Sequence, residues 1–291
     1  MFNVATFDRK IIDTLLNAGV LNDSTHTLLE LAEQHGGYIA GGFALQVYQV
    51  MIESNSLHEN ASVLRNSYLQ SNLAIRDVTD PNKTPSPGDI DVWFETVEQL
   101  TQFVAAYDKL PVSAQSSVYV KKTIGGFATN YFCFDEFGAC GQKVQVITGL
   151  LGDSEFVCSR FDTLNTMCVL HGCCIEFDER LPEVVKNKEV VINPGPSMMT
   201  GIGSIHMRLN RIFEWGTRHK YNFVTSQITA LINEKFDDIV VDCAEPVDSA
   251  SAYGNELISS VVCNVGRFFV KELNDSNLRK LSLYLMSGRL D

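Results

Sequence analysis

The chain has 291 residues, of which 45% are hydrophobic and 20% are charged. This composition is typical of a globular protein, and the length allows one large domain or two smaller ones. No run of about eighteen apolar residues is present, so we expect no membrane span. The net charge of −12 gives a field that repels nucleic acid, which argues against tight non-specific DNA binding.

The cysteines and the first residues of the chain predict where the protein works. Eight cysteines occur without a Cys-x-x-Cys motif, which suits neither a disulfide framework nor a zinc site. Residues 1–8 lack the basic flank and the long apolar stretch of a secretion signal. We therefore expect a protein of the reducing cytoplasm.

The amino-terminal part predicts two helices and then a buried strand. Residues 8–35 repeat apolar side chains at helical spacing, and Ser24 or Thr25 is the expected cap of the second helix. The apolar run Tyr38–Ala40 predicts a strand, and residues 43–52 predict an apolar helix. A pair of glycines joins this strand to this helix.

Gly41 and Gly42 are suited to binding phosphate. Because glycine lacks a Cβ atom, the backbone can approach a ligand closely at these positions. The amino terminus of the helix that follows favours anions. This strand-Gly-Gly-helix unit predicts a binding site for the phosphates of a nucleoside triphosphate (NTP).

A polar segment at residues 54–88, rich in Asn, Ser, Thr and Pro, predicts an insertion that ends in a loop. It leads into Asp89 and Asp91, which open an apolar strand. Alternation along a strand places these carboxylates on one face, about 7 Å apart. Two carboxylates at this spacing can hold a pair of Mg²⁺ or Mn²⁺ ions that activate an attacking oxygen and a leaving pyrophosphate. A structural turn is the alternative interpretation of the motif.

The rest of the chain divides into a mixed half and a helical half. Residues 97–110 predict a helix capped by Thr96. Strand patterns recur at residues 117–121, 128–134, 143–148 and 166–177. From about residue 203 only helical patterns follow. We predict an α+β fold with a mixed sheet flanked by helices in residues 1–200, followed by a helical domain in residues 201–291.

The glycine pair with residues 43–45, followed by residues 89–94, resembles the signature of the DNA polymerase β-like nucleotidyltransferase superfamily. Residues 143–147, 159–162 and 208–221 follow in the order found in its virus- and phage-encoded members. The resemblance implies a metal-dependent enzyme that transfers a nucleoside monophosphate (NMP) from an NTP to a hydroxyl acceptor. For a phage-encoded protein, the expected location is the host cytoplasm.

The resemblance also implies roles for single residues. Asp89 and Asp91 would be the catalytic metal ligands, and the glycine pair would bind the β- and γ-phosphates. The family supplies a third carboxylate from a neighbouring strand. Here the strand that fits is residues 143–147, and its inward candidate is Gln145, a neutral amide.

Three further residues are candidates for the same site. Asp162 lies in a predicted loop and either completes the metal site from another direction or caps the element that follows. Arg208 and Arg211 are three residues apart on a predicted helix and share a face. They either contact the triphosphate or the acceptor, or form a solvated helix edge.

Three functions remain open from the sequence. The first is a metal-dependent nucleotidyltransferase whose acceptor is an RNA end, a protein hydroxyl or a small molecule. The second is a catalytically inactive protein of the same fold that binds nucleotide or serves in assembly, which the neutral Gln145 and the insertion favour. The third is an unrelated α/β protein in which both motifs are coincidental.

Overall fold

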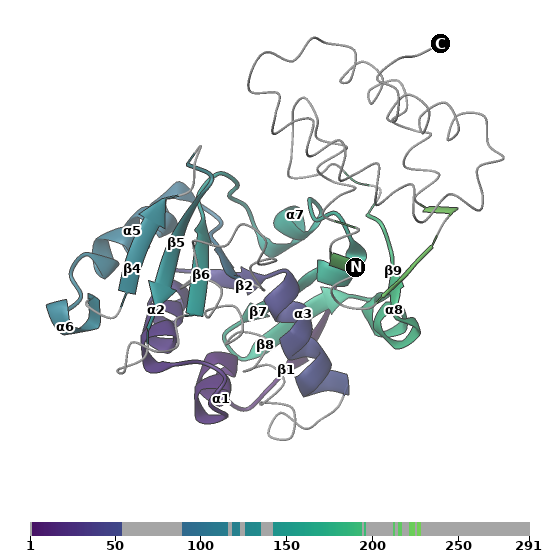
Figure 1. The fold of residues 1–291 in the computed structure, drawn as a ribbon, viewed down its shortest axis with the longest axis horizontal. Coiled ribbons are helices and arrows are strands. Elements are labelled where there is room, and N and C mark those ends of the chain that lie inside the picture. The colour runs from purple at the N-terminus through teal and green to yellow at the C-terminus, as the bar shows by residue number, and fades with distance from the viewer. Residues whose placement is uncertain are drawn as a thin grey trace, which may run out of the picture. The chain divides into compact units, whose positions relative to one another are not determined.

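The structure is a computed structural model of the chain, drawn in Figure 1. It describes residues 2–53, 89–115, 118–122, 126–134, 142–193, 195, 212, 215–216, 221–224 and 226–227. The predicted insertion at 54–88 and nearly all of the predicted helical domain at 201–291 lie outside the described residues. Among the described residues, no helix is long and apolar enough to cross a membrane.

The chain forms two compact units. The first consists of Met1–Ser159 and Thr166–Leu181, and the second of Arg160–Asn165 and Pro182–Asp291. The first unit contains both the glycine pair and the aspartate pair. The predicted domain boundary at residue 200 falls outside the described residues and stays a prediction.

An eight-stranded sheet forms the centre of the first unit (Figure 1). Across the sheet, the strands are β1 (Phe2–Thr6), β8 (Cys174–Asp178), β7 (Cys168–His171), β2 (Tyr38–Ala40), β3 (Ile90–Trp93), β6 (Gln142–Ile147), β5 (Ala128–Cys133) and β4 (Val118–Lys122). Strands β3 and β6 are parallel, and the other neighbouring pairs are antiparallel. The predicted mixed sheet is therefore confirmed.

The two faces of the sheet differ in polarity where β3, β6 and β5 lie side by side. Ile90 and Val92 of β3 are fully buried, whereas Asp91 between them is only partly buried. Paired residues on neighbouring strands share a face. The Asp91 face therefore continues through Gln145 of β6 to Asn130 of β5. This polar row runs across the middle of the sheet.

Helices of the first unit flank the sheet. They are α1 (Ile11–Asn17), α2 (Asp23–Gln34), α3 (Gly42–Tyr48), η1 (Gln49–Glu53), α5 (Val97–Tyr107), α6 (Val112–Gln115) and α7 (Ser154–Cys158). Two more, η2 (Leu164–Thr166) and α8 (Leu181–Asn187), belong largely to the second unit. Helix α3 lies against β2, β3 and β7 (Figure 1). Helix α5 packs through Phe103, whose ring centroid is 5.3 Å from that of Phe94 and 6.0 Å from that of Tyr131. Thr96 caps α5 in a capping box with Gln99, as predicted for this helix.

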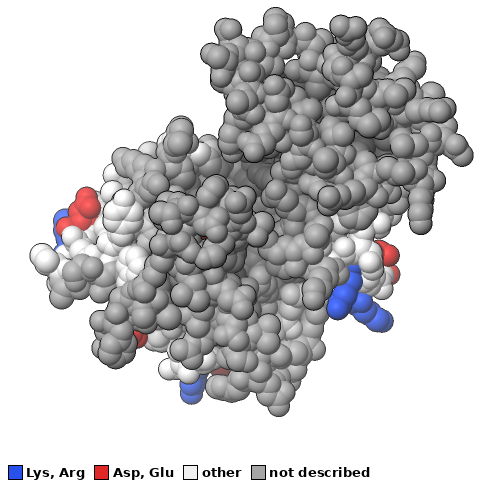
Figure 2. All heavy atoms as spheres, in the orientation of Figure 1, with Lys and Arg blue, Asp and Glu red and all other residues white. Residues whose placement is uncertain are grey.

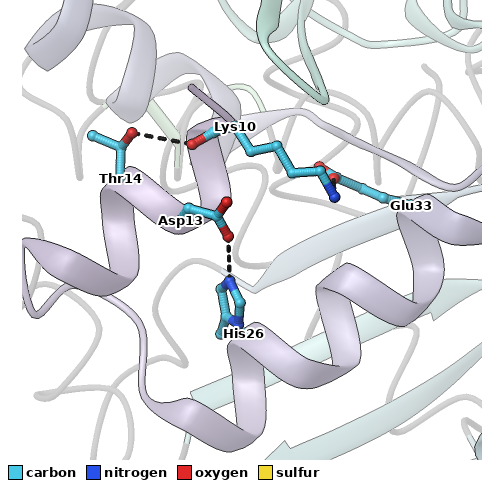
Figure 3. A network of polar contacts seen from close by, with 5 residues as sticks. All are labelled: Lys10, Asp13, Thr14, His26 and Glu33. Atoms are coloured by element: carbon cyan, nitrogen blue, oxygen red, sulfur yellow. Dashed lines mark hydrogen bonds and ion pairs between the residues drawn. The ribbon is translucent and has the colours of Figure 1, made fainter. Parts of the chain in front are cut away.

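Polar side chains join α1 to α2, as Figure 3 shows. Nε2 of His26 lies 2.7 Å from Oδ1 of Asp13, and Nζ of Lys10 lies 3.8 Å from Oε2 of Glu33. Oγ1 of Thr14 donates to the Lys10 carbonyl at 3.0 Å, within the first turn of α1. The predicted helix pair before the glycine strand is therefore present.

The cap of α2 differs from the prediction. Asn22, rather than Ser24 or Thr25, is the N-cap, and its side chain accepts from the Thr25 N–H at 2.7 Å. The Asn22 side chain also donates to the carbonyl of Cys133, and its N–H donates to Oε1 of Gln142. The helix start is thus set by contacts with β5 and β6, which lie far away in the sequence.

Two strands of the central sheet were not predicted from the sequence. β1 was not expected, because an edge strand takes its hydrogen bonds from a distant partner, here β8. The single strand predicted at residues 166–177 is a hairpin of β7 and β8. The chain turns at Gly172, whose φ of 58° suits glycine.

In the second unit, Asn165 holds a short strand, β9 (Glu189–Val190). Its Nδ2 donates to the Glu189 carbonyl at 2.8 Å, and its Oδ1 accepts from the Val191 N–H at 3.0 Å. β9 pairs in parallel with β10 (Asn222–Phe223). β10 lies between two of the helices predicted after residue 203, at a place where no strand was expected.

Candidate active site

The predicted aspartate pair lies on one of the two central strands of the sheet, between β2 and β6. Asp89 immediately precedes β3, and Asp91 is the second residue of β3. Because side chains alternate along a strand, both belong to the polar face described above. The apolar residue between them, Ile90, is fully buried on the opposite face and anchors the strand.

Lys143 of β6 forms an ion pair with Asp89. The Nζ and Oδ2 atoms are 2.6 Å apart, and the two side chains are 18% and 22% exposed. The parallel register, which pairs Ile90 with Val144, brings the residue before each of them together. Because both side chains are largely buried, the effective dielectric constant around them is lower than at the surface. Their attraction is therefore stronger than that of a surface pair.

Gln145 occupies the position beside Asp91 on β6. Its Nε2 donates to Oδ1 of Asn130 on β5 at 2.8 Å. The amide is thus already bonded within the polar row. Gln145 thus puts a neutral amide at the position where the resemblance implies a third carboxylate.

The surroundings of Asp91 disfavour its charge. Burial is the main cause that raises its pKa well above the ordinary value, and the negative charge of Asp89 raises it further. The positive charge of Lys143 acts in the opposite direction. Oδ1 of Asp91 is buried and has no hydrogen-bond partner in the described part of the chain. A bound cation would give this oxygen a positively charged partner and so favour the ionised carboxylate.

The aspartate pair fits a hard divalent cation. Mg²⁺ and Mn²⁺ prefer oxygen ligands, and carboxylates are their usual protein ligands. Within the described residues, no group of three or more His, Cys, Asp or Glu side chains is placed to hold a metal ion. The donor set that the described structure offers is therefore two carboxylates.

The glycine pair follows β2, the strand that pairs with β3, and begins α3. Gly41 is the N-cap with φ 98° and ψ −145°, a conformation that is open almost only to glycine. Gly42 is the first helical residue, and a Cβ added there would meet no described atom within 4 Å. The backbone conformation thus requires glycine at Gly41. At Gly42 there is open space beside the backbone. After Tyr48 the helix continues as a π-helical turn.

The structure does not test the roles predicted for three other residues. Asp162 is a buried residue of the second unit, where its carbonyl accepts from the Asn193 N–H at 2.9 Å. Arg208 and Arg211 lie outside the described residues. In Figure 2, the described Lys and Arg side chains form separate groups at the edges of the face in view. Roles for Asp162 and the two arginines stay predictions.

Sequence reasoning missed Lys143 and Asn130. Lys143 is two residues before Gln145, so alternation alone would have placed it on the same strand face. What no local pattern could reveal is the register that sets Lys143 beside Asp89. Asn130 lies on a strand whose partner is likewise decided only in the folded sheet.

The sequence matches no protein-family model and no curated protein. Solved structures give matches. The Thermotoga maritima CCA-adding enzyme complexed with tRNA(CCA) has a TM-score of 0.50 and 10% identity, over 99% of this chain and 57% of that one. A CCA-adding enzyme in apo form I has a TM-score of 0.47 and 12% identity, over 98% of this chain and 54% of that one.

A complex of a CCA-adding enzyme with ATP also matches, with a TM-score of 0.45 and 10% identity, over 97% of this chain and 66% of that one. The chain thus spans between 54% and 66% of the length of these three enzymes. The likeness to the T. maritima enzyme confirms the predicted fold. The likeness to virus- and phage-encoded members stays a prediction.

Proposed function

We propose that this chain is a divalent-metal-dependent nucleotidyltransferase that transfers NMP from an NTP to a hydroxyl acceptor. The observation that carries the proposal is the buried, unpartnered Oδ1 of Asp91, on a strand face shared with Asp89. Burying an unpaired carboxylate costs free energy, and a bound cation would offset that cost. The fold of the first unit supports the same conclusion.

The aspartate pair and the glycine pair would bind different parts of the metal–nucleotide complex. Asp89 and Asp91 would hold Mg²⁺ or Mn²⁺, which when bound stabilises charge on the phosphoryl oxygens and promotes loss of the acceptor proton. The backbone at Gly41 and Gly42 would bind the β- and γ-phosphates, because this turn leaves room for a close approach. Positioning and charge stabilisation are the main tasks of a protein in phosphoryl transfer.

RNA is the acceptor to test first. The T. maritima enzyme that shares this fold was solved with tRNA. An acidic chain requires a local basic surface to hold RNA, and Arg208 and Arg211 are the predicted source of that surface. A protein hydroxyl or a small molecule is the acceptor if RNA is not labelled.

The residues of the polar row and Lys143 favour a second function, nucleotide binding without catalysis. Lys143 already neutralises Asp89, and Gln145 supplies no negative charge beside Asp91. Both features weaken a site for two metal ions. A protein with this arrangement could bind Mg-NTP as a sensor or assembly component without transferring NMP.

One experiment tests the proposed function and separates it from the alternative. The protein is incubated with each α-labelled NTP, Mg²⁺ or Mn²⁺, and cellular RNA or a protein extract, and both label transfer and pyrophosphate release are measured. We expect Asp89→Asn and Asp91→Asn each to abolish transfer. The matched control is Asp108→Asn, an exposed acid at the end of α5, which should retain full activity.

The outcomes are distinct. Full turnover by either aspartate variant would show that the metal ligands are misassigned. Metal-dependent NTP binding without pyrophosphate release from any acceptor would establish the non-catalytic function instead. Loss of transfer in a folded Asp162→Asn would support the prediction that Asp162 is a further metal ligand.

A further inference from the structure

Lys143 occupies a position at which a metal ion would be expected. Its ammonium lies 2.6 Å from Oδ2 of Asp89, so the two groups form both a hydrogen bond and an ion pair. Strand β6 holds it there, because the parallel register sets it directly beside Asp89. The position of this positive charge is therefore part of the sheet.

The charge of the site limits how many cations it can hold. Among the described residues, Asp89 and Asp91 carry two negative charges when both are ionised, and Lys143 offsets one of them. The neighbouring strand position, Gln145, is neutral and is bonded to Asn130. One net negative charge suits one divalent ion, because the number of ligand charges sets the affinity of such sites. A second divalent ion would meet uncompensated repulsion.

The two carboxylates are not equivalent. Oδ1 is buried in both residues. Oδ2 of Asp89 already has a cation at contact distance, whereas no described residue forms an ion pair with Asp91. Asp91 is thus the carboxylate that needs a metal ion.

We propose that the Lys143 ammonium takes the place of one of two divalent cations, so that the aspartate pair binds a single Mg²⁺ or Mn²⁺ ion through Asp91. This inference rests on the proposed function. Lys143 is a charge-balancing residue of the site, which neutralises Asp89 without a bound metal. A single ion then suffices for the pair.

The test counts bound metal ions directly. The full chain without nucleotide is titrated with Mn²⁺, and free Mn²⁺ is followed by electron paramagnetic resonance. We expect one Mn²⁺ per wild-type chain and two per chain in Lys143→Met, which removes the charge but keeps most of the side-chain length. Lys143→Arg keeps the charge and should bind one ion.

A matched control is the ion pair of Lys10 with Glu33, which Figure 3 shows between α1 and α2. Glu33 is buried enough that its pKa is raised, chiefly by burial, so it too is an acid beside a lysine. Lys10→Met removes that ammonium and should leave the Mn²⁺ count at one. Thermal melting of every variant verifies that it is folded.

Each other result overturns a defined part of the proposal. Two Mn²⁺ ions in the wild type would refute the role of Lys143 and leave the proposed function intact. An unchanged count and affinity in a folded Lys143→Met would refute it as well. No Mn²⁺ binding by the wild type would overturn the metal site on which the proposed function depends.

Discussion

At the scale of single residues, the Asp91 carboxylate couples metal binding to stability. Its pKa is raised in the folded protein, so the folded state binds this proton more tightly than the unfolded state does. The resulting penalty is absent at pH below the ordinary value of 3.8 and grows as the pH rises toward the raised pKa. The unfolding free energy of the metal-free protein is therefore lowered by this group at neutral pH.

Asp91→Asn should therefore stabilise the metal-free protein at neutral pH. The neutral amide removes the buried charge and its repulsion from Asp89. We expect the melting temperature of the variant to exceed that of the wild type by more at about pH 8 than at about pH 5. Excess Mg²⁺ should raise the melting temperature of the wild type only. Equal differences at both pH values would show that burial of this charge carries no penalty.

The two glycines should respond differently to substitution, since only Gly41 has a positive φ. Gly41→Ala forces alanine into a strained backbone conformation, which costs about 1–3 kcal/mol in unfolding free energy. Gly42→Ala should fold normally, because a Cβ there meets no described atom. Urea unfolding of the two variants measures this contrast, and equal losses would contradict it.

Gly42→Val tests phosphate binding at the same turn. A branched side chain would fill the space that a phosphate needs, so NTP affinity should fall at least tenfold, or about 1.4 kcal/mol. Isothermal calorimetry with Mg-NTP gives the affinity, with Gly42→Ala as the smaller control. Undiminished binding by a folded Gly42→Val would exclude this turn as the phosphate site.

At the scale of elements, the polar row depends on three neighbouring strands. β3 supplies Asp91, β6 supplies Gln145 and β5 supplies Asn130, with one hydrogen bond between the two amides. The opposite side of the row is tightly packed, since Ile90 and Val144 are fully buried. The strands therefore hold the polar groups at fixed spacing.

Gln145→Asp should strengthen metal binding and weaken the metal-free fold. A third carboxylate beside Asp91 adds a hard oxygen ligand and one negative charge. It also removes a donor to Asn130 and adds repulsion in a partly buried place. We expect Mn²⁺ affinity to rise about tenfold, with a lower melting temperature in the absence of metal. Gln145→Asn, which stays neutral, is the control and should show no gain in affinity.

At the scale of the whole molecule, net charge opposes the proposed acceptor. A chain of net charge −12 repels RNA unless a local basic surface offsets this field. Arg208 and Arg211 are the predicted source of such a surface. Contacts between arginine and phosphate release counterions from the nucleic acid. The contribution of these contacts to binding affinity therefore decreases as the salt concentration rises.

The double variant Arg208→Ala with Arg211→Ala should weaken binding of the acceptor or the triphosphate and reduce its dependence on salt. Affinity measured over a series of salt concentrations gives the slope of log K against log salt, which should become shallower by about one to two. The control is Lys109→Ala, an exposed residue just after α5. A slope equal to that of the wild type would leave the arginines as solvated surface.

Local sequence was sufficient for the elements of the candidate site. The Tyr38–Ala40 strand, the glycine turn and the Thr96 cap were predicted because each depends on residues that are neighbours in the chain. The shared face of Asp89 and Asp91 follows from strand alternation for the same reason. The sequence alone thus predicted which residues to examine.

Only the tertiary structure decided what surrounds them. Lys143 is 54 residues from Asp89 in the sequence, and the parallel pairing of β3 with β6 brings their charges together. The Asn22 cap and the edge strand β1 likewise depend on partners far along the chain. Local patterns specify which face a side chain occupies, but strand order and register arise from burying the apolar faces of all the strands together. The charge balance around Asp91 is therefore a property of the folded sheet.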